Sequence, residues 1–237
     1  MTLAVLSTNA QVEEARTVLD RRGLSSITPD WKALLQRHRL LPGFRIGDRL
    51  KSWDVLKSVE FIEARLGRDA PILDIGSYAS ELPLILLRMG YRRVAGVDLN
   101  PDITRMPDAG AIDYRVGDFL RAPFPDGVFA AVTSISVIEH GFNGEALATE
   151  VARLLKPGGF FIASFDYWPE KIHTDGQDIF GMSWTIFSKS EVEQFIALAK
   201  GRGLVPFGTL DFSASEKPIS CFGRDYTFGW LVLTKSG

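Results

Sequence analysis

The stretch ILDIGSYASELPLILLRMG, residues 72–90, decides the fold. An apolar strand ends in Asp74, a turn follows at Gly76, and an apolar helix runs to Gly90. A strand, a glycine turn and a helix in this order typically open a nucleotide-binding unit of a parallel α/β sheet. Such turns usually carry two or three glycines, whereas Tyr78 and Ser80 stand here where the others are expected.

The residues after the turn favour the start of a helix. Ser80 is a good N-cap, and Glu81 suits the first turn because a helix N-terminus carries partial positive charge. Pro83 falls at the third helical position, whose N–H has no partner within the helix. We therefore predict a helix over 80–89. Tyr78 is tolerated in the turn if its φ is negative and its ring points out of the loop.

Beyond residue 71, short apolar runs alternate with amphipathic helices, which predicts a parallel sheet covered on both faces. The last two runs have only a 12-residue polar loop between them, so they should pair antiparallel. We expect a Rossmann-like α/β fold with seven strands, mostly parallel, and a reversed last strand. The expected strands are 71–75, 93–99, 112–116, 129–135, 159–165, 205–213 and 226–235. Helices are expected around 147–155 and 192–199.

The first 70 residues form a helical extension in this interpretation. Apolar residues recur at helical spacing over 9–22 and 52–66, and a shorter helix is expected around 30–38. We divide the chain into this extension, residues 1–70, and a main domain, residues 71–237. The extension is predicted to cap the functional site.

Composition narrows the class of protein. Hydrophobic residues make up 46% and charged residues 24%, as in a soluble globular protein. The net charge of −2 gives no basic surplus for gripping nucleic acid. The single Cys221 cannot form an internal disulfide, and neither a signal peptide nor a membrane-spanning run is visible. We expect a cytoplasmic protein without nucleic-acid or membrane partners.

Three carboxylates stand at the ends of successive predicted strands. Asp74 closes the first strand, and Asp98 closes the second, 22 residues after Gly76. That spacing suits a carboxylate that accepts hydrogen bonds from both hydroxyls of a ribose. Asp118 follows the third strand, where it could accept from an adenine amino group while Phe119 packs on the ring.

Taken in order, these segments resemble the class I S-adenosylmethionine-dependent methyltransferases, and the resemblance covers residues 71–237. The segments are ILDIGSYAS, VAGVDLNPD, VGDF, FAAVTSISVIEH and LLKPGGFFIAS. The resemblance implies S-adenosyl-L-methionine as cofactor, with the Gly76 turn at its methionine end, Asp98 at its ribose and Asp118 at its adenine. The full set of cofactor-binding residues that it implies is Asp74, Gly76, Ser77, Tyr78, Asp98, Leu99, Asp118, Phe119, Ser134 and Ile135.

Two other interpretations stay open. A nicotinamide-dependent dehydrogenase would carry Gly-x-Gly-x-x-Gly, which is absent. The pair Tyr167 and Lys171 imitates a dehydrogenase motif, but Pro169 between them favours a turn. The second alternative is a non-catalytic cofactor-binding or scaffold subunit of the same fold, suggested by the missing glycines. Retention of Asp98 and Asp118 argues against it.

The acceptor side is expected in the long connection over 166–187, because a connection of this length in a compact domain is usually functional. Asp166, Tyr167 and Trp168 directly follow a strand end, and we predict that they contact the substrate. Polar and aromatic groups together suit a hydroxylated, carbohydrate-like acceptor. The remaining aromatics of the connection are expected to pin it to the sheet: Phe180, Trp184 and Phe187.

Glu139 and His140 follow the fourth predicted strand. The family resemblance implies that such a histidine can act as the general base of O-methylation, and a neutral imidazole suits that role near pH 7. His140 is therefore the candidate catalytic residue, with a packed residue beside the site as the alternative, and Glu139 is assigned to the substrate side. A metal would need more ligands than this pair, and Ser136 stands where a further acid would help, so no metal is predicted.

The function predicted from the sequence is methyl transfer from S-adenosyl-L-methionine to a small polar metabolite or a glycan, most simply to an oxygen. The sequence does not name the acceptor, the choice of oxygen over nitrogen or carbon, or the oligomeric state.

Overall fold

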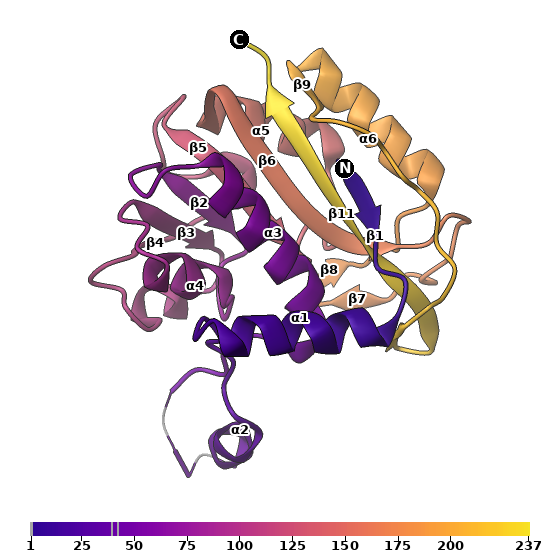
Figure 1. The fold of residues 1–237 in the computed structure, drawn as a ribbon. Helices are drawn as coiled ribbons and strands as arrows, with labels where there is room; N and C mark the ends of the chain where they lie inside the picture. The colour runs from indigo at the N-terminus through magenta and orange to yellow at the C-terminus, as the bar shows by residue number, and fades with distance from the viewer. Residues whose placement is uncertain (1, 39, 42) are drawn as a thin grey trace.

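A twisted nine-stranded sheet forms the centre of the computed structural model, which describes residues 2–38, 40–41 and 43–237 (Figure 1). Its main path runs β1-β11-β6-β5-β2-β3-β4, and β9 and β10 also pair with β11. A separate small hairpin joins β7 and β8. The strands are β1 (Leu3–Val5), β2 (Ile72–Ile75), β3 (Val94–Asp98), β4 (Asp113–Val116), β5 (Phe129–Ile135), β6 (Leu155–Tyr167), β7 (Asp178–Ile179), β8 (Met182–Ser183), β9 (Leu204–Pro206), β10 (Ile219–Cys221) and β11 (Arg224–Lys235).

The strand directions confirm the predicted α/β fold. β4, β3, β2, β5 and β6 run parallel to their neighbours. β11 runs antiparallel to β6, with Thr227 opposite Tyr167 and Thr234 opposite Phe160. The reversed last strand is therefore present, and the sheet differs from the prediction in the number and length of its edge strands.

The difference lies at the outer edge of β11. The predicted strand over 205–213 is wrong beyond Pro206, where β9 ends. β1 occupies the next part of that edge, with Leu3 opposite Leu231, and the chain at Thr209 hydrogen-bonds to the amide of Thr2 instead. The two ends of the chain thus share one sheet, a pairing that no local pattern predicts.

The six α-helices of the described chain follow the predicted helical segments. They are α1 (Asn9–Arg21), α2 (Asp30–Arg37), α3 (Ser52–Arg65), α4 (Leu82–Arg88), α5 (Gly144–Leu154) and α6 (Lys189–Gly201). Short 3-10 turns are η1 (Arg49–Lys51), η2 (Pro101–Arg105) and η3 (Phe119–Arg121).

The start of α4 corrects one prediction. The N-cap is Glu81 and not Ser80, and no side chain caps the helix. The turn before it places Ala79 at φ +62°, while Tyr78 keeps a negative φ as expected. The carboxylate of Glu81 is engaged elsewhere, because it pairs with Arg16 of α1. The helix start is therefore set by contacts with the N-terminal segment.

Helices cover both faces of the sheet, as predicted (Figure 1). α1, α3 and α4 contribute to one cluster of buried apolar side chains, and α5 and α6 to the other. Because β1 lies in the main sheet and α3 packs against α1 and α4, the N-terminal segment shares the first of these cores. Because helices cover both faces of the sheet, a ligand site is expected at the carboxyl ends of the parallel strands.

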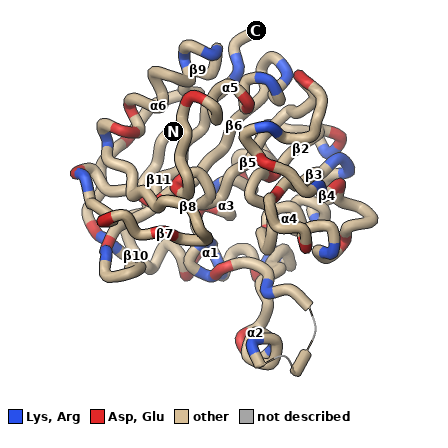
Figure 2. The backbone as a smooth tube through the Cα atoms, turned by 180° about the vertical axis from the view of Figure 1, so that it is seen from behind, with Lys and Arg blue, Asp and Glu red and all other residues tan. Residues whose placement is uncertain are grey.

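Charged residues are distributed around the periphery, with Lys and Arg interspersed among Asp and Glu (Figure 2). None of the helices in the described residues is both long and apolar enough to cross a membrane.

Candidate functional site

Asp98 anchors the turn between β2 and α4. Its Oδ2 accepts a hydrogen bond from the backbone N–H of Tyr78 at 3.0 Å, and its Oδ1 accepts one from Asn100 at 2.8 Å. The carboxylate is half-buried, so part of it still faces solvent at the carboxyl end of β3. Asp98 thus holds the turn in place and retains lone pairs for a ligand hydroxyl.

Gly76 is required by the packing of the chain around the turn. Its φ is +66°, and a Cβ added there would lie 2.4 Å from Cγ2 of Val137. The glycine therefore allows close packing of the loop after β5 on the turn. Val137 covers the turn from the β5 side.

Below the turn lies a set of buried polar atoms. Asp74 is buried and accepts a hydrogen bond from the hydroxyl of Thr133 at 2.6 Å. Burial raises the pKa of Asp74 to about 6. The hydroxyl oxygens of Ser77 and Ser134 are buried without a hydrogen-bond partner in the described residues. Unpartnered buried hydroxyls are costly, so these two fit a site that gains polar contacts when a ligand binds.

The ends of β3 and β4 form an open apolar surface beside Asp98. Asp98 is the register partner of Val116, and the side chains of Leu99 and Val116 are 57% and 47% exposed. Asp118 lies exposed just beyond, where its carboxylate caps η3 through the N–H of Leu120. Exposed apolar side chains next to two carboxylates suit a flat heteroaromatic ring joined to a sugar. Phe119 is half-buried at the same edge, and Ile135 is half-buried at the end of β5.

A group of buried acids lies at the carboxyl ends of β5 and β6. Asp54 is fully buried, Glu139 is 1% exposed and Asp166 is 4% exposed. Burial and the neighbouring charge of Asp166 raise the pKa of Glu139 to about 8. Burial raises the pKa of Asp54 to about 6 and also raises that of Asp166. The positive charge of Lys51 opposes all three shifts.

Lys51 connects the N-terminal segment to these acids. Its ammonium donates to the hydroxyl of Ser136 and lies 3.8 Å from the centre of the Phe228 ring. The Ser136 N–H donates to Ser164 Oγ at 3.0 Å, and the Ser164 hydroxyl donates to Asp54 at 2.6 Å. This chain joins η1, the loop after β5, β6 and α3.

His140 lies on the same loop but faces a different environment. It is half-buried, and its Nδ1 has no partner in the described residues. Its ring meets Phe180 edge to face at 5.4 Å. Burial, followed by the charge of Lys51, lowers the pKa of His140 to about 4. The imidazole is therefore neutral at physiological pH.

Strand geometry separates the three residues expected to contact substrate. Asp166 lies with the acids, and Trp184 Nε1 donates to its Oδ2 at 2.7 Å. Tyr167 points to the opposite face, where it is fully buried and its hydroxyl donates to the Phe212 carbonyl. Successive side chains of a strand alternate between faces, so placing Tyr167 beside Asp166 was wrong. Trp168 is half-buried, with Lys217 Nζ 4.5 Å above its ring.

The three aromatic residues of the long connection have different surroundings. Phe187 packs on Phe142 and Phe165, which confirms that it pins the connection. Trp184 is buried as well, and its indole N–H donates a hydrogen bond to the carboxylate of Asp166. Phe180 is 85% exposed, so the expectation that it is pinned to the sheet was wrong.

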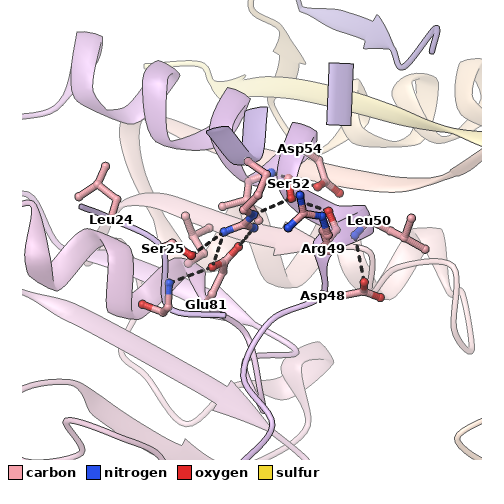
Figure 3. A network of polar contacts seen from close by, with 12 residues as sticks. Leu24, Ser25, Asp48, Arg49, Leu50, Ser52, Asp54 and Glu81 are labelled. Atoms are coloured by element: carbon pink, nitrogen blue, oxygen red, sulfur yellow. Dashed lines mark hydrogen bonds and ion pairs between the residues drawn. The ribbon is translucent and has the colours of Figure 1, made fainter. Parts of the chain in front are cut away.

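The N-terminal segment is tied to the site by a polar network (Figure 3). Arg16 donates to both oxygens of Glu81 and to Ser52, and the Ser26 N–H donates to Glu81. The ring of Tyr78 meets the ring of Phe44 edge to face, with 6.0 Å between the ring centres. The Tyr78 side chain therefore packs on the N-terminal segment. These contacts hold Ser26, Phe44 and Ser52 close to the turn and to Glu81.

The sequence did not reveal Lys51, Asp54 and Ser164 as members of the site. Asp54 was the only one with a local signal, since it is a carboxylate within the helix predicted at 52–66. In the described part of the chain, no group of three or more His, Cys, Asp or Glu side chains is arranged to hold a metal ion.

The mostly parallel sheet with its reversed last strand and the carboxylates at its edge define a Rossmann-like domain of the class I methyltransferase type. The methyltransferase domain family matches residues 73–163. These residues therefore form a methyltransferase domain of the S-adenosylmethionine-dependent class.

Known proteins resemble different portions of the chain. A ubiquinone biosynthesis O-methyltransferase of Xanthomonas oryzae pv. oryzae (strain PXO99A) is 31% identical over 120 residues, which are 47% of this chain and 50% of that protein. The match thus spans about half the length of this relative. The 1,6-didemethyltoxoflavin-N1-methyltransferase of Burkholderia thailandensis, solved with S-adenosylhomocysteine, has a TM-score of 0.55 at 17% identity, covering 78% of this chain and 79% of that one.

A third similarity extends over nearly the whole chain. The [4+2]-cyclase SpnF has a TM-score of 0.59 at 14% identity, covering 99% of this chain and 98% of that one. At this identity the similarity concerns the fold alone. Because the fold is shared by proteins named for different reactions, the activity has to be argued from the site.

Proposed function

We propose that this protein transfers the methyl group of S-adenosyl-L-methionine to an oxygen of a small polar acceptor, a metabolite or a glycan unit. The observation that carries the proposal is the edge formed by β3 and β4. There Asp98 and Asp118 flank the exposed side chains of Leu99 and Val116, next to the turn at Gly76. When bound, the cofactor supplies an electrophilic methyl group on a sulfonium.

The chain would contribute mainly by positioning. Asp98 would accept from the ribose hydroxyls, with its carboxylate already oriented by two backbone amides. Leu99 and Val116 would contact the adenine, and Asp118 would accept from its amino group. Holding an acceptor oxygen in line with the methyl group can supply much of the rate enhancement.

His140 is the candidate base. A neutral imidazole can take a proton, although its lowered pKa makes it a weak base. The resemblance to O-methyltransferases over about half of a relative's length favours oxygen as the acceptor atom.

A non-catalytic role of the same fold is the alternative, and one observation favours it. Val137 packs where a Cβ on Gly76 would lie, so the loop after β5 rests directly on the turn.

The experiment is calorimetry with S-adenosylhomocysteine, with NADH as the comparison ligand, followed by methyl transfer from labelled S-adenosylmethionine to a set of hydroxylated acceptors. We expect S-adenosylhomocysteine to bind and NADH not to bind. Binding of NADH alone would contradict the proposal. Cofactor binding without transfer to any acceptor would favour the non-catalytic alternative.

A further inference from the structure

The buried acids at the ends of β5 and β6 outnumber the cations that act on them. Three carboxyl groups, Asp54, Glu139 and Asp166, share the site with the single ammonium of Lys51. Within the described residues, none of the three forms an ion pair. A buried carboxyl group without a paired cation is held in its neutral form by desolvation, as the raised pKa of Glu139 indicates, and a cationic ligand would allow it to ionise.

Two of these acids also have an oxygen without a partner. Oε2 of Glu139 and Oδ1 of Asp166 are buried and accept no hydrogen bond in the described residues. The Thr185 N–H donates to the Glu139 carbonyl at 2.9 Å, and the indole N–H of the adjacent Trp184 donates to Asp166 at 2.7 Å, so both acids lie beside residues 184–185. A buried acceptor without a donor costs free energy, and a ligand with N–H groups would remove that cost.

Aromatic rings stand beside Asp166. The rings of Trp184 and Tyr226 are 5.8 Å apart, and those of Tyr226 and Phe228 are 6.2 Å apart. The Phe228 ring already has the ammonium of Lys51 over it at 3.8 Å. Carboxylates combined with aromatic faces are a typical environment for an organic ammonium. A metal ion fits less well, because no three-ligand cluster exists in the described residues.

We infer that the acceptor carries a protonated amine, which Glu139 and Asp166 bind. The amine anchors the acceptor so that a neighbouring oxygen faces the methyl donor. This inference rests on the proposed function and narrows its acceptor to aminated hydroxyl compounds, such as amino sugars or aryl-alkyl amines with a phenol.

The test uses matched pairs of probes that differ in the amine: glucosamine with glucose, and tyramine with 4-ethylphenol. Their affinities are measured by calorimetry on the full chain saturated with S-adenosylhomocysteine. We expect at least one amine to bind at least about tenfold more tightly than its neutral partner, the effect of a hydrogen bond to a charged group. Equal binding within both pairs, or no binding of either amine at millimolar concentration, would overturn the inference.

Variants then assign the preference to the two acids. Glu139→Gln and Asp166→Asn keep the shape of each side chain and remove its ability to ionise, and the preference for the amine should fall to less than about threefold. Glu170→Gln, at an exposed acid, is the control and should keep the full preference. A preference that survives in both site variants would contradict the assignment.

Affinity for S-adenosylhomocysteine is measured first in every variant. Unchanged affinity in Glu139→Gln and Asp166→Asn shows that the variants are folded and that the acids do not serve the cofactor. A loss of cofactor affinity equal to the loss of amine affinity would assign the acids to the cofactor and overturn the inference. If the wild-type chain binds no S-adenosylhomocysteine, the proposed function fails, whereas amine binding to the cofactor-free protein still tests the acids.

Discussion

Arg16 and Glu81 form a buried ion pair that joins α1 to the start of α4, with 2.5 Å between Nη2 and Oε1. Their side chains are only 3% and 2% exposed. The pair lies directly after the turn that carries Tyr78, so it ties the N-terminal segment to the part of the chain expected to bind the cofactor (Figure 3).

Removing one partner of this pair should destabilise the fold strongly. Arg16→Met leaves the Glu81 carboxylate buried without its cation, and the free energy of unfolding should fall by about 3–5 kcal/mol. Urea denaturation measures the change. Glu13→Gln is the matched control, because the Arg49–Glu13 pair is about 60% exposed on both sides and should be worth less than about 1 kcal/mol. Equal losses in the two variants would mean that the buried pair contributes no more than a surface pair.

Asp98 should control cofactor affinity. Asp98→Ala removes the acceptor for the Tyr78 and Asn100 amides as well as the proposed ribose contact, at about 1–3 kcal/mol for each group left unsatisfied. We expect affinity for S-adenosylhomocysteine, measured by calorimetry, to fall at least about tenfold. Asp102→Ala alters a nearby carboxylate that pairs with Arg105 at the surface and should leave affinity unchanged. An Asp98→Ala protein with wild-type affinity would reduce Asp98 to a turn residue.

Tyr78→Gly should loosen the N-terminal segment. The substitution supplies the glycine common in the family, but it removes the ring that packs on Phe44 and adds chain entropy to the turn. We expect faster hydrogen exchange over residues 25–48 and weaker binding of S-adenosylhomocysteine. Tyr78→Phe keeps the ring and serves as the control. Unchanged exchange together with tighter binding in the glycine variant would show that the tyrosine is merely tolerated.

The stability of the protein should fall as the pH rises, because of the Glu139 carboxyl group. The pKa of Glu139 is about 8 in the folded protein and about 4.5 in the unfolded chain, so the folded state holds one more proton between these values. The contribution of the Glu139 proton to the free energy of unfolding is fully present below pH 4.5 and is lost as the pH rises through 8.

Glu139→Gln removes this titration and should flatten the fall in the thermal midpoint between pH 5 and 8. The effect should be at least a few degrees, since about 1 kcal/mol already shifts the midpoint of a domain of this size by about 2–4 °C. Glu170→Gln is the control because that acid is exposed. Identical slopes for the wild type and Glu139→Gln would show that this carboxyl is ionised in the folded state.

His140 should affect turnover more than binding. If it accepts the acceptor proton, His140→Ala should lower kcat by about 10²–10⁴-fold with little change in cofactor affinity. His173→Ala, at an exposed histidine, should leave kcat unchanged. Since burial holds the pKa of His140 near 4, its protonation should not limit the rate between pH 6 and 8. A kcat within twofold of wild type would make His140 a packing residue.

The sequence by itself determined the parallel sheet, the helices and the positions of the edge carboxylates. Near-continuous apolar runs separated by amphipathic helices have few other ways to bury their side chains, and parallel strands bring their carboxyl ends to one edge. Asp98 and Asp118 could therefore be placed without coordinates. The reversed strand followed from the absence of a crossover helix.

Only the tertiary structure decided which residues surround the buried acids. Lys51 and Asp54 come from the N-terminal segment, far in sequence from Glu139 and Asp166. Lys51 acts on both of these acids, and Asp54 is joined to Lys51 through Ser164 and Ser136. The pairing of β1 with β11 likewise joins the two ends of the chain. Local patterns record propensity and periodicity, whereas burial, pKa shifts and unpartnered oxygens arise from contacts between distant segments.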